Sequence, residues 1–175
     1  MRAIVFTLGF SFLAIMGVKA QMFPQISAES VKGKTTEIPT ALNGTKSIVF
    51  LAFTAEAESK LQHWYEPVYM MFLDQSGFNA MAYDCEVKLM MMFTGASQGA
   101  ANKIIDNIKK NVDPSMAEML LFYQGNFSEQ MNALGLKKKD DCYVFVLDEN
   151  GKILLQETGS YSESKLDKIA SLVEL

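Results

Sequence analysis

The chain alternates continuous apolar runs with stripes of apolar residues at helical spacing. Ser47 to Phe53 (SIVFLAF) is a continuous run bounded by polar residues, which predicts a central strand buried on both faces of a sheet. From Ala57 to Leu73 the apolar residues recur at helical spacing, which predicts a helix. Pro67 lies inside this helix and has no amide hydrogen, so a kink is expected there. The apolar stripe consists of Leu61, Trp64, Val68, Met71 and Phe72.

The following segments repeat this alternation. We expect a strand within Phe78 to Met92, a helix over Ser97 to Lys110, a strand over Met119 to Tyr123 and a short helix ending at Leu134. The second helix is predicted to turn one apolar face toward the sheet. That face consists of Ala101, Ile104, Ile105 and Ile108.

A β-hairpin near the C-terminus is the clearest local signal. Tyr143 to Leu147 and Lys152 to Gln156 have strand composition, and the turn between them ends in an Asn-Gly pair. Capping-box spacing at Asn126 to Glu129 and at Ser160 to Glu163 predicts the starts of the last two helices. The alternating order implies right-handed β-α-β units in a mainly parallel sheet, with the hairpin adding antiparallel strands at one side.

The first twenty residues have the parts of a secretory signal. Arg2 supplies a positive charge, Ala3 to Val18 is an apolar run, and small residues near Ala20 allow cleavage before Gln21. The alternative is a membrane anchor, but the run is shorter than the roughly 20 residues that a spanning helix needs. We therefore expect residues 1–20 to be removed and 21–175 to form a single exported domain, periplasmic or secreted, without a stable membrane anchor.

Charge and cysteine content narrow the possible partners. The net charge of −4 becomes −6 when Arg2 and Lys19 leave with the signal, and Arg2 is the only arginine. An acidic domain without guanidinium groups is poorly suited to nucleic acid. Cys85 and Cys142 lie 57 residues apart, so they form no Cys-x-x-Cys motif. Together with the single His63 they do not have the spacing of a zinc site, and no metal or other cofactor is expected.

Three segments resemble the thioredoxin-like superfamily, nearest its peroxiredoxin-like (AhpC/TSA-like) and membrane-tethered reductase branches. They are FPQISAESVKGKTTEIP, SIVFLAFTAEAESKL and DDCYVFVLDENGKILLQETG, and the resemblance covers most of residues 23–175. It implies an α/β fold, a three-layer sandwich with a mixed, mainly parallel sheet and a C-terminal hairpin and helix. The chain is also similar to mitochondrial ATP-synthase assembly factors of this fold, near Trp64 and Pro67 and in ALGL…CYVFVLDENGKI. In that family the fold is kept while redox chemistry is not required.

The resemblance also places the positions that carry chemistry in the superfamily. It puts Glu58 where the attacking cysteine would stand, Leu61 where the resolving cysteine would stand, and Cys142 in place of the cis-proline. Neither Glu58 nor Leu61 can perform thiol chemistry. Without a proline, a cis peptide before Cys142 would cost about 3 kcal/mol, so a trans peptide is expected there.

Five side chains are candidates for function. Cys142 is either a thiol at the rim beside the helix start or an apolar residue entering a strand, and Cys85 is either a second thiol or a core residue. A bridge between them is not expected, because the superfamily's strand order keeps their segments apart. Glu56 and Glu58 are either an acid and base pair or charges that complement the helix dipole. Trp64 is predicted to anchor the helix on the sheet; if exposed, it is a rim contact for a partner, together with Glu56.

Two functions follow from a retained fold without its nucleophile. The first is a non-redox, non-catalytic module that binds or assembles another protein of the cell envelope, whose identity the sequence leaves open. The second is an atypical thiol oxidoreductase or peroxidase-like enzyme that uses Cys142, with or without Cys85. Asp140 and Asp141 oppose the low thiol pKa that such an enzyme needs, and the lysines at 137–139 offset them in part.

Overall fold

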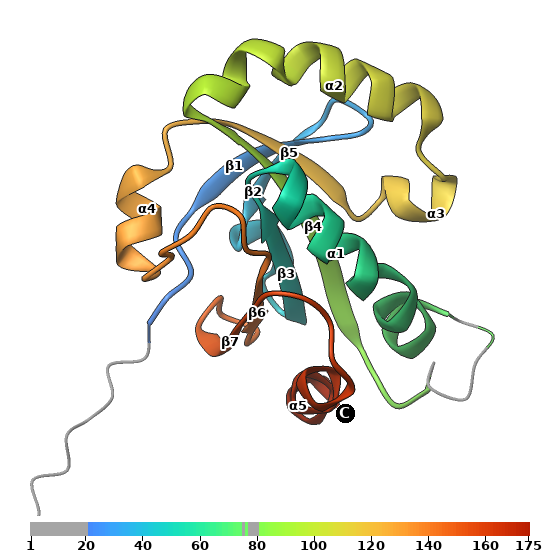
Figure 1. Ribbon diagram of the computed structural model, residues 1–175. Helices are drawn as coiled ribbons and strands as arrows, with labels where there is room; N and C mark the ends of the chain where they lie inside the picture. The colour runs from blue at the N-terminus through green and yellow to red at the C-terminus, as the bar shows by residue number, and fades with distance from the viewer. Residues whose placement is uncertain (1–20, 75, 77–80) are drawn as a thin grey trace, which may run out of the picture.

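A computed structural model describes residues 21–74, 76 and 81–175. The predicted signal, residues 1–20, lies outside the described residues. Seven strands form one sheet in the order β2-β1-β5-β4-β3-β6-β7 (Figure 1). The strands are β1 (Ile26–Ser30), β2 (Thr35–Ile38), β3 (Lys46–Ala52), β4 (Cys85–Thr94), β5 (Leu120–Gly125), β6 (Tyr143–Leu147) and β7 (Ile153–Thr158). The helices are α1 (Ala55–Val68), α2 (Gln98–Asn111), α3 (Pro114–Ala117), α4 (Ser128–Ala133) and α5 (Glu163–Val173), with short turns η1 (Thr40–Leu42), η2 (Tyr69–Leu73) and η4 (Gly95–Ser97).

The sheet is mixed, with its parallel part at the centre. β3 pairs in parallel with β4, and β4 with β5. Antiparallel pairs flank this centre, because β1 joins β5 on one side and β6 joins β3 on the other. Antiparallel pairings therefore outnumber parallel ones, which corrects the expectation of a mainly parallel sheet. The segment before Pro39 forms the antiparallel hairpin of β1 and β2, which the hydrophobic pattern did not predict.

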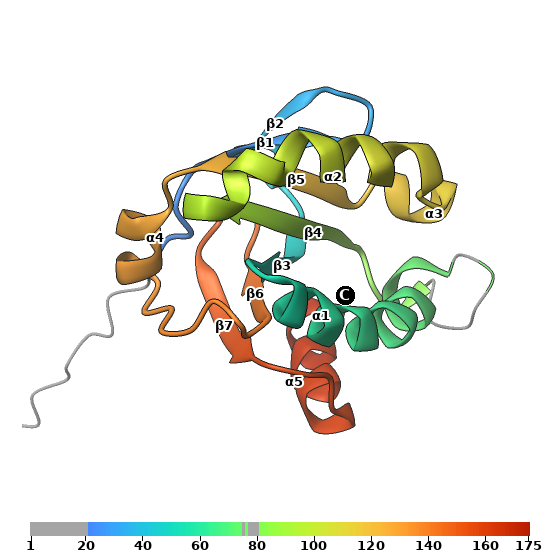
Figure 2. The same ribbon diagram turned by 45° about the horizontal axis from the view of Figure 1, so that its top comes forward.

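The helices and loops form a layer on each face of the sheet (Figures 1 and 2). One face packs against α1, α2 and α5, where it buries alternate residues of β3 such as Ile48 and Phe50. The opposite face packs against the segments around η1 and α4, which contribute Leu42 and Phe127. β3 is buried on both faces, as its continuous apolar run predicts, although β4 holds the middle of the strand order.

Helix α1 begins at the carboxyl end of β3 and changes form after Pro67. Thr54 caps its start, since the Thr54 side chain accepts a hydrogen bond from the Ala57 amide at 3.3 Å. The chain then continues as a wider π-helical turn, η2, directly after Val68. Such wide turns accommodate a break in the regular hydrogen-bond ladder. The irregularity expected around Pro67 therefore takes the form of a change of helix type.

The hairpin of β6 and β7 forms as predicted. Asp148 Oδ1 accepts hydrogen bonds from the amides of Asn150 and Lys152, both at 2.9 Å, and closes the turn. Gly151 has a φ of +81°, and a Cβ built there would lie 2.6 Å from Cγ of Pro39. Only glycine satisfies both conditions, so this turn also fixes the hairpin against the loop after β2.

Three local predictions are wrong. Neither predicted capping box forms: Asn126 Oδ1 accepts from the Ser128 amide two residues on, at 3.0 Å, and α5 starts after Ser162 without a side-chain cap. The Asn126 contact is a local alternative that a short polar side chain offers the backbone. Ile104 does not face the sheet; it is 40% exposed, whereas Ile105 is 4% exposed.

Candidate functional site

The start of α1 is the position at which this fold carries chemistry in the superfamily that the sequence resembles. Thr54 and Ala55 occupy the first positions of the helix, Glu58 lies one turn inside it and Leu61 lies almost a turn further. The helix therefore starts earlier than the alignment of Glu58 with the attacking cysteine implied. The segment 53–61 (FTAEAESKL) contains no cysteine, so either register leaves the helix start without a thiol.

The same end of α1 is fastened to the loop before β6. Lys60 Nζ lies 2.9 Å from Asp141 Oδ1 and 3.1 Å from Glu56 Oε1, and it donates to the backbone carbonyl of Asp140 at 2.6 Å. Hydrogen bonds to Asp141 and then to Glu56 raise the pKa of Lys60. Thr54 Oγ1 also donates to Asp140 Oδ1 at 3.0 Å. The loop therefore holds the start of α1 in place, and we call these contacts of Thr54 and Lys60 with residues 140 and 141 the clasp. Glu56, which pairs with Lys60, is its exposed member.

Cys142 is buried within this clasped region. The side chain is 0% exposed, and the peptide before it is trans, as expected. Burial raises the pKa of the Cys142 thiol to about 12, and the nearby Asp141 adds to this, against the opposing effect of Lys165 and Lys60. A thiol with this pKa is protonated near neutral pH and is a poor nucleophile. The structure places Cys142 in the core and not at an open rim.

Cys85 lies at the other end of the sheet. It begins β4, where it pairs with Lys46 at the start of β3, whereas Cys142 precedes Tyr143, which pairs with Leu51 near the end of β3. The length of β3 therefore separates the two thiols, about 20 Å at the usual rise per strand residue. Both are free, and burial, followed by the charges of Asp84 and Glu86, raises the pKa of Cys85 to about 12. They do not form one site.

Trp64 is an interior anchor. Its side chain is 0% exposed, and Nε1 donates to the Gly159 carbonyl at 3.0 Å. The indole packs edge to face against Phe50 and Tyr161, with ring centroids 5.6 and 5.5 Å away. It therefore ties α1 to β3 and to the segment before α5, as the anchor prediction required, and it presents no surface to a partner. His63, its neighbour, is exposed.

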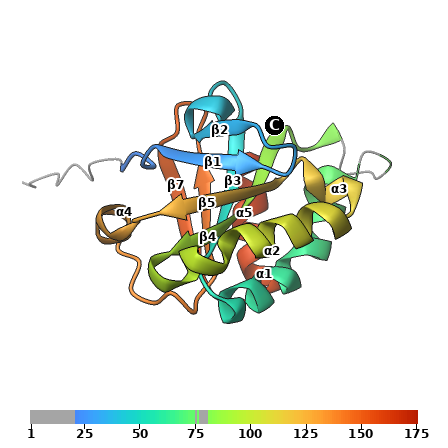
Figure 3. The ribbon, with the colours of Figure 1, turned by 90° about the horizontal axis from the view of Figure 1, so that it is seen from above.

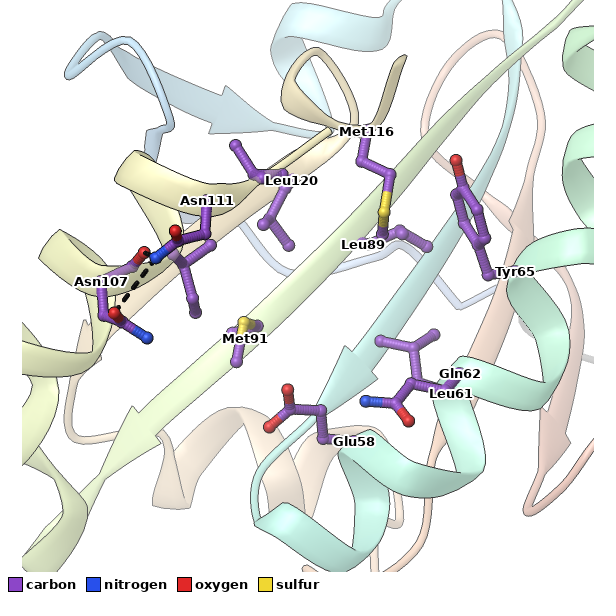
Figure 4. A pocket seen from close by; sticks show the side chains of 12 residues that line it. Glu58, Leu61, Gln62, Tyr65, Leu89, Met91, Asn107, Asn111, Met116 and Leu120 are labelled. Atoms are coloured by element: carbon purple, nitrogen blue, oxygen red, sulfur yellow. Dashed lines mark hydrogen bonds between the residues drawn. The ribbon is translucent and has the colours of Figure 1, made fainter. Parts of the chain in front are cut away.

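An apolar groove of about 420 Å³ lies on the other side of α1, between α1 and α2 (Figure 4). Strand β4 forms its floor with Leu89 and Met91, and Figure 3 shows the two helices on the same face of the sheet. The Glu58 carboxylate points into the space between the helices. The groove is lined by Glu58, Leu61, Gln62, Tyr65, Leu89, Met91, Asn107, Ile108, Asn111, Val112, Met116 and Leu120.

Sequence reasoning found Glu58 and Leu61 but missed the groove as a whole. Its α2 wall includes Ile108, which the helical spacing placed on the apolar face of the helix, and Val112 directly after α2 adds to it. The sequence did contain one sign of the groove, which is the width of the apolar stripe on α2. The helix has more apolar residues on one side than a single line of contact with the sheet can bury. Among residues 21–74, 76 and 81–175 there is no cluster of three His, Cys, Asp or Glu side chains that could hold a metal ion.

Sequence comparison identifies the family. The sequence model described as "ATP10 protein" matches residues 14–175, most of the chain. The chain belongs to the ATP10 protein family. This family is a thioredoxin-fold family of assembly factors. No individually curated protein sequence matches the chain.

Comparison with solved structures supports the same fold for this ATP10 family member. The pneumococcal exposed lipoprotein thioredoxin Etrx1 of Streptococcus pneumoniae has 12% identity and a TM-score of 0.57, covering 85% of this chain and 99% of its own. BsSco, of the Sco family of cytochrome c oxidase assembly proteins, has 12% identity and a TM-score of 0.57, with 88% and 92% covered. The thioredoxin domain of a Bacteroides vulgatus thiol-disulfide oxidoreductase has 13% identity and a TM-score of 0.53, with 88% and 96% covered. The thioredoxin-like α/β fold is therefore established.

Within the part of the chain that the structure describes, no helix is both long enough and apolar enough to cross a membrane.

Proposed function

We propose that this ATP10 family member is a non-redox module of the cell envelope that binds or assembles another protein. The observation that carries the proposal is the start of α1, where Thr54 and Ala55 stand and no thiol is present. Of the two thiols elsewhere, Cys142 is buried and Cys85 is partly buried; burial raises the pKa of each to about 12, and they lie at opposite ends of β3. Thiol exchange needs an accessible thiolate, and this arrangement offers none among the described residues.

Export through the predicted signal in residues 1–20 is part of the same proposal, with a periplasmic or secreted mature domain. Membership of a family of assembly factors supports the role in assembly, and a pneumococcal exposed lipoprotein thioredoxin and a cytochrome c oxidase assembly protein share the fold. Both are similar only in fold, so the partner and the compartment are inferred for this chain from its own leader and its own site.

The alternative function, an atypical thiol oxidoreductase or peroxidase that uses Cys142 with or without Cys85, makes the opposite prediction for chemistry. We expect the purified protein to show neither reduction of insulin disulfides nor turnover of hydrogen peroxide with dithiothreitol. The control is Cys142→Ser, which should leave this baseline unchanged. Turnover that is present in the wild type and lost in Cys142→Ser would establish the thiol enzyme and overturn the non-redox proposal.

A further inference from the structure

The groove between α1 and α2 combines apolar walls with one charge. Its apolar lining consists of aliphatic and thioether side chains from α1, β4 and α2, such as Leu61, Met91 and Ile108. Among the described residues that line it, Glu58 alone carries a charge near neutral pH. A carboxylate held over an apolar surface favours an occupant with a cation flanked by apolar groups, because such a cation pairs with Glu58 while its neighbours leave water.

A second, smaller hollow of about 140 Å³ continues the groove beyond Glu58. It is lined by the start of α1 and by Ile104 of α2, and it shares Glu58 and Met91 with the main groove. Glu58 therefore lies between two apolar hollows. From Ala55 to Tyr65 the α1 wall is about 15 Å long at the usual helical rise, which matches four to five residues of extended peptide.

The lips of the groove favour a peptide over a hydrocarbon chain. Gln62 on α1 and Asn107 and Asn111 on α2 place amide groups along both edges. The side-chain Nδ2 of Asn111 donates to the Asn107 backbone carbonyl at 2.8 Å and to Asn107 Oδ1 at 3.2 Å, which orders the α2 edge of the groove. Side-chain amides supply both donors and acceptors, which a peptide backbone needs when it leaves water and a hydrocarbon chain does not.

The charges outside the groove restrict where a cation fits. Lys103 and Lys110 lie with Asp106 along the outer side of α2, beyond the Asn107 lip. A cationic side chain on that side meets two lysines and one carboxylate, whereas on the α1 side it meets Glu58. Charge complementarity therefore fixes both the sign of the occupant's charge and its place.

From these observations we infer that the groove binds a short apolar peptide segment of the partner protein, with a Lys or Arg at the residue that passes Glu58. This inference rests on the proposed function and names the chemistry of the partner. The bound segment has the pattern apolar, basic, apolar, apolar, in extended conformation, with its basic side chain between the two hollows.

The test uses two blocked pentapeptides, acetyl-LKLFL-amide and acetyl-LELFL-amide, added to the isotopically labelled purified protein and followed by NMR chemical shifts. We expect the Lys peptide to shift the amide signals of residues in α1 and α2 that line the groove, and the Glu peptide to bind at least about tenfold more weakly. Glu58→Gln should weaken the Lys peptide about tenfold. Glu163→Gln is the matched control, because Glu163 is likewise an acid in the first turn of a helix, α5, but lies exposed and away from the groove.

Asn111→Trp supplies an independent test, because it places a large side chain on an exposed lip and should block both peptides while the thermal unfolding midpoint stays near that of the wild type. Equal affinity for the two peptides, no effect of Glu58→Gln, or shifts confined to another surface would overturn the inference. A dimer that Asn111→Trp dissociates would overturn it as well, because a second copy of the chain would then occupy the groove.

The failure of this inference is distinguishable from the failure of the proposed function. One outcome is that cross-linking in the native envelope captures the same partner with wild type, Glu58→Gln and Asn111→Trp in equal yield. In that outcome the protein-binding function stands and the groove is not its site. Thiol turnover by the wild type that depends on Cys142 would instead remove the proposed function itself.

Discussion

The two long sides of α1 meet the rest of the molecule in different ways. On the side toward β6 and α5, Trp64 donates to the Gly159 carbonyl, and the Gly159 amide donates to the Cys142 carbonyl at 2.7 Å. The indole N–H and the Gly159 amide are thus both hydrogen-bonded, and the rings of Phe50 and Tyr161 pack edge to face against the indole. This sealed side is packed like the interior of a stable domain.

On the side toward α2, the contact is open. Ile108, Val112 and Met116 are only half-buried. The Tyr65 and Ser115 hydroxyls lie 3.2 Å apart and join α1 to α3, the short helix that follows α2. The fold thus holds α1 from one side and leaves apolar surface accessible on the other. Half-exposed apolar surface contributes little to folding, and it is typical of a surface that binds another molecule.

The largest expected effect belongs to the sealed side. Trp64→Ala should lower the free energy of unfolding by about 3–5 kcal/mol, because it removes a fully buried indole and leaves a cavity. Tyr65→Ala, on the next residue and facing the open groove, should cost about 1 kcal/mol. Urea unfolding followed by circular dichroism measures both. Equal losses in the two variants would mean that the groove side is as tightly packed as the Trp64 side.

A matched pair on α2 makes the comparison sharper, because the residue type and the helix are the same. Ile105 is 4% exposed and packs in the core, whereas Ile108 is half-buried and lines the groove. Ile105→Ala should cost about 2–5 kcal/mol and Ile108→Ala about 1 kcal/mol. If calorimetry finds that Ile108→Ala is the more damaging of the two, the groove wall supports the fold and is not a free surface.

The sequence predicted the sealed side well and the open side poorly, for a physical reason. A continuous run such as 47–53 has few alternatives to a buried strand, and a tryptophan on a helical stripe almost always packs. Periodicity, however, gives the direction of a side chain but not what lies opposite. Ile104 and Ile105 are adjacent isoleucines, and only the angle between α2 and the sheet decides that one is exposed and the other buried.

The same limit applies to the candidate site. The absence of a Cys-x-x-Cys motif is read directly from the sequence, and so is the trans peptide expected before Cys142. The burial of Cys142 and the clasp of Lys60 on Asp141 are contacts between segments about 80 residues apart. Local patterns contain no information on such contacts, so the sequence did not show that the largely exposed loop at 137–141 also holds the start of α1.

Burial of Cys142 on the sealed side has a consequence for stability in alkali. Its pKa is about 12 in the folded protein against 9.0 for an exposed thiol, so the unfolded chain loses this proton first as the pH rises. The contribution of this thiol to the free energy of unfolding is therefore fully present below about pH 9. It is lost between pH 9 and 12, by about 1.4 kcal/mol per pH unit. Cys142→Ala should reduce that slope, measured by urea unfolding at pH 8 and pH 10. An unchanged slope would mean that solvent reaches the thiol and that this side is not sealed.

The smallest expected effect belongs to Glu58 on the open side. Its carboxylate complements the start of α1, which is worth about 0.3–1 kcal/mol, and its half-buried position offsets part of that gain. Glu58→Ala should therefore lower the free energy of unfolding by at most about 1 kcal/mol, close to the cost of Glu163→Ala in the first turn of α5. Chemical unfolding of the two variants in parallel provides the measurement. A loss of several kcal/mol for Glu58→Ala alone would show that Glu58 holds α1 in place, and the open side would then be part of the scaffold and not a surface kept free for a partner.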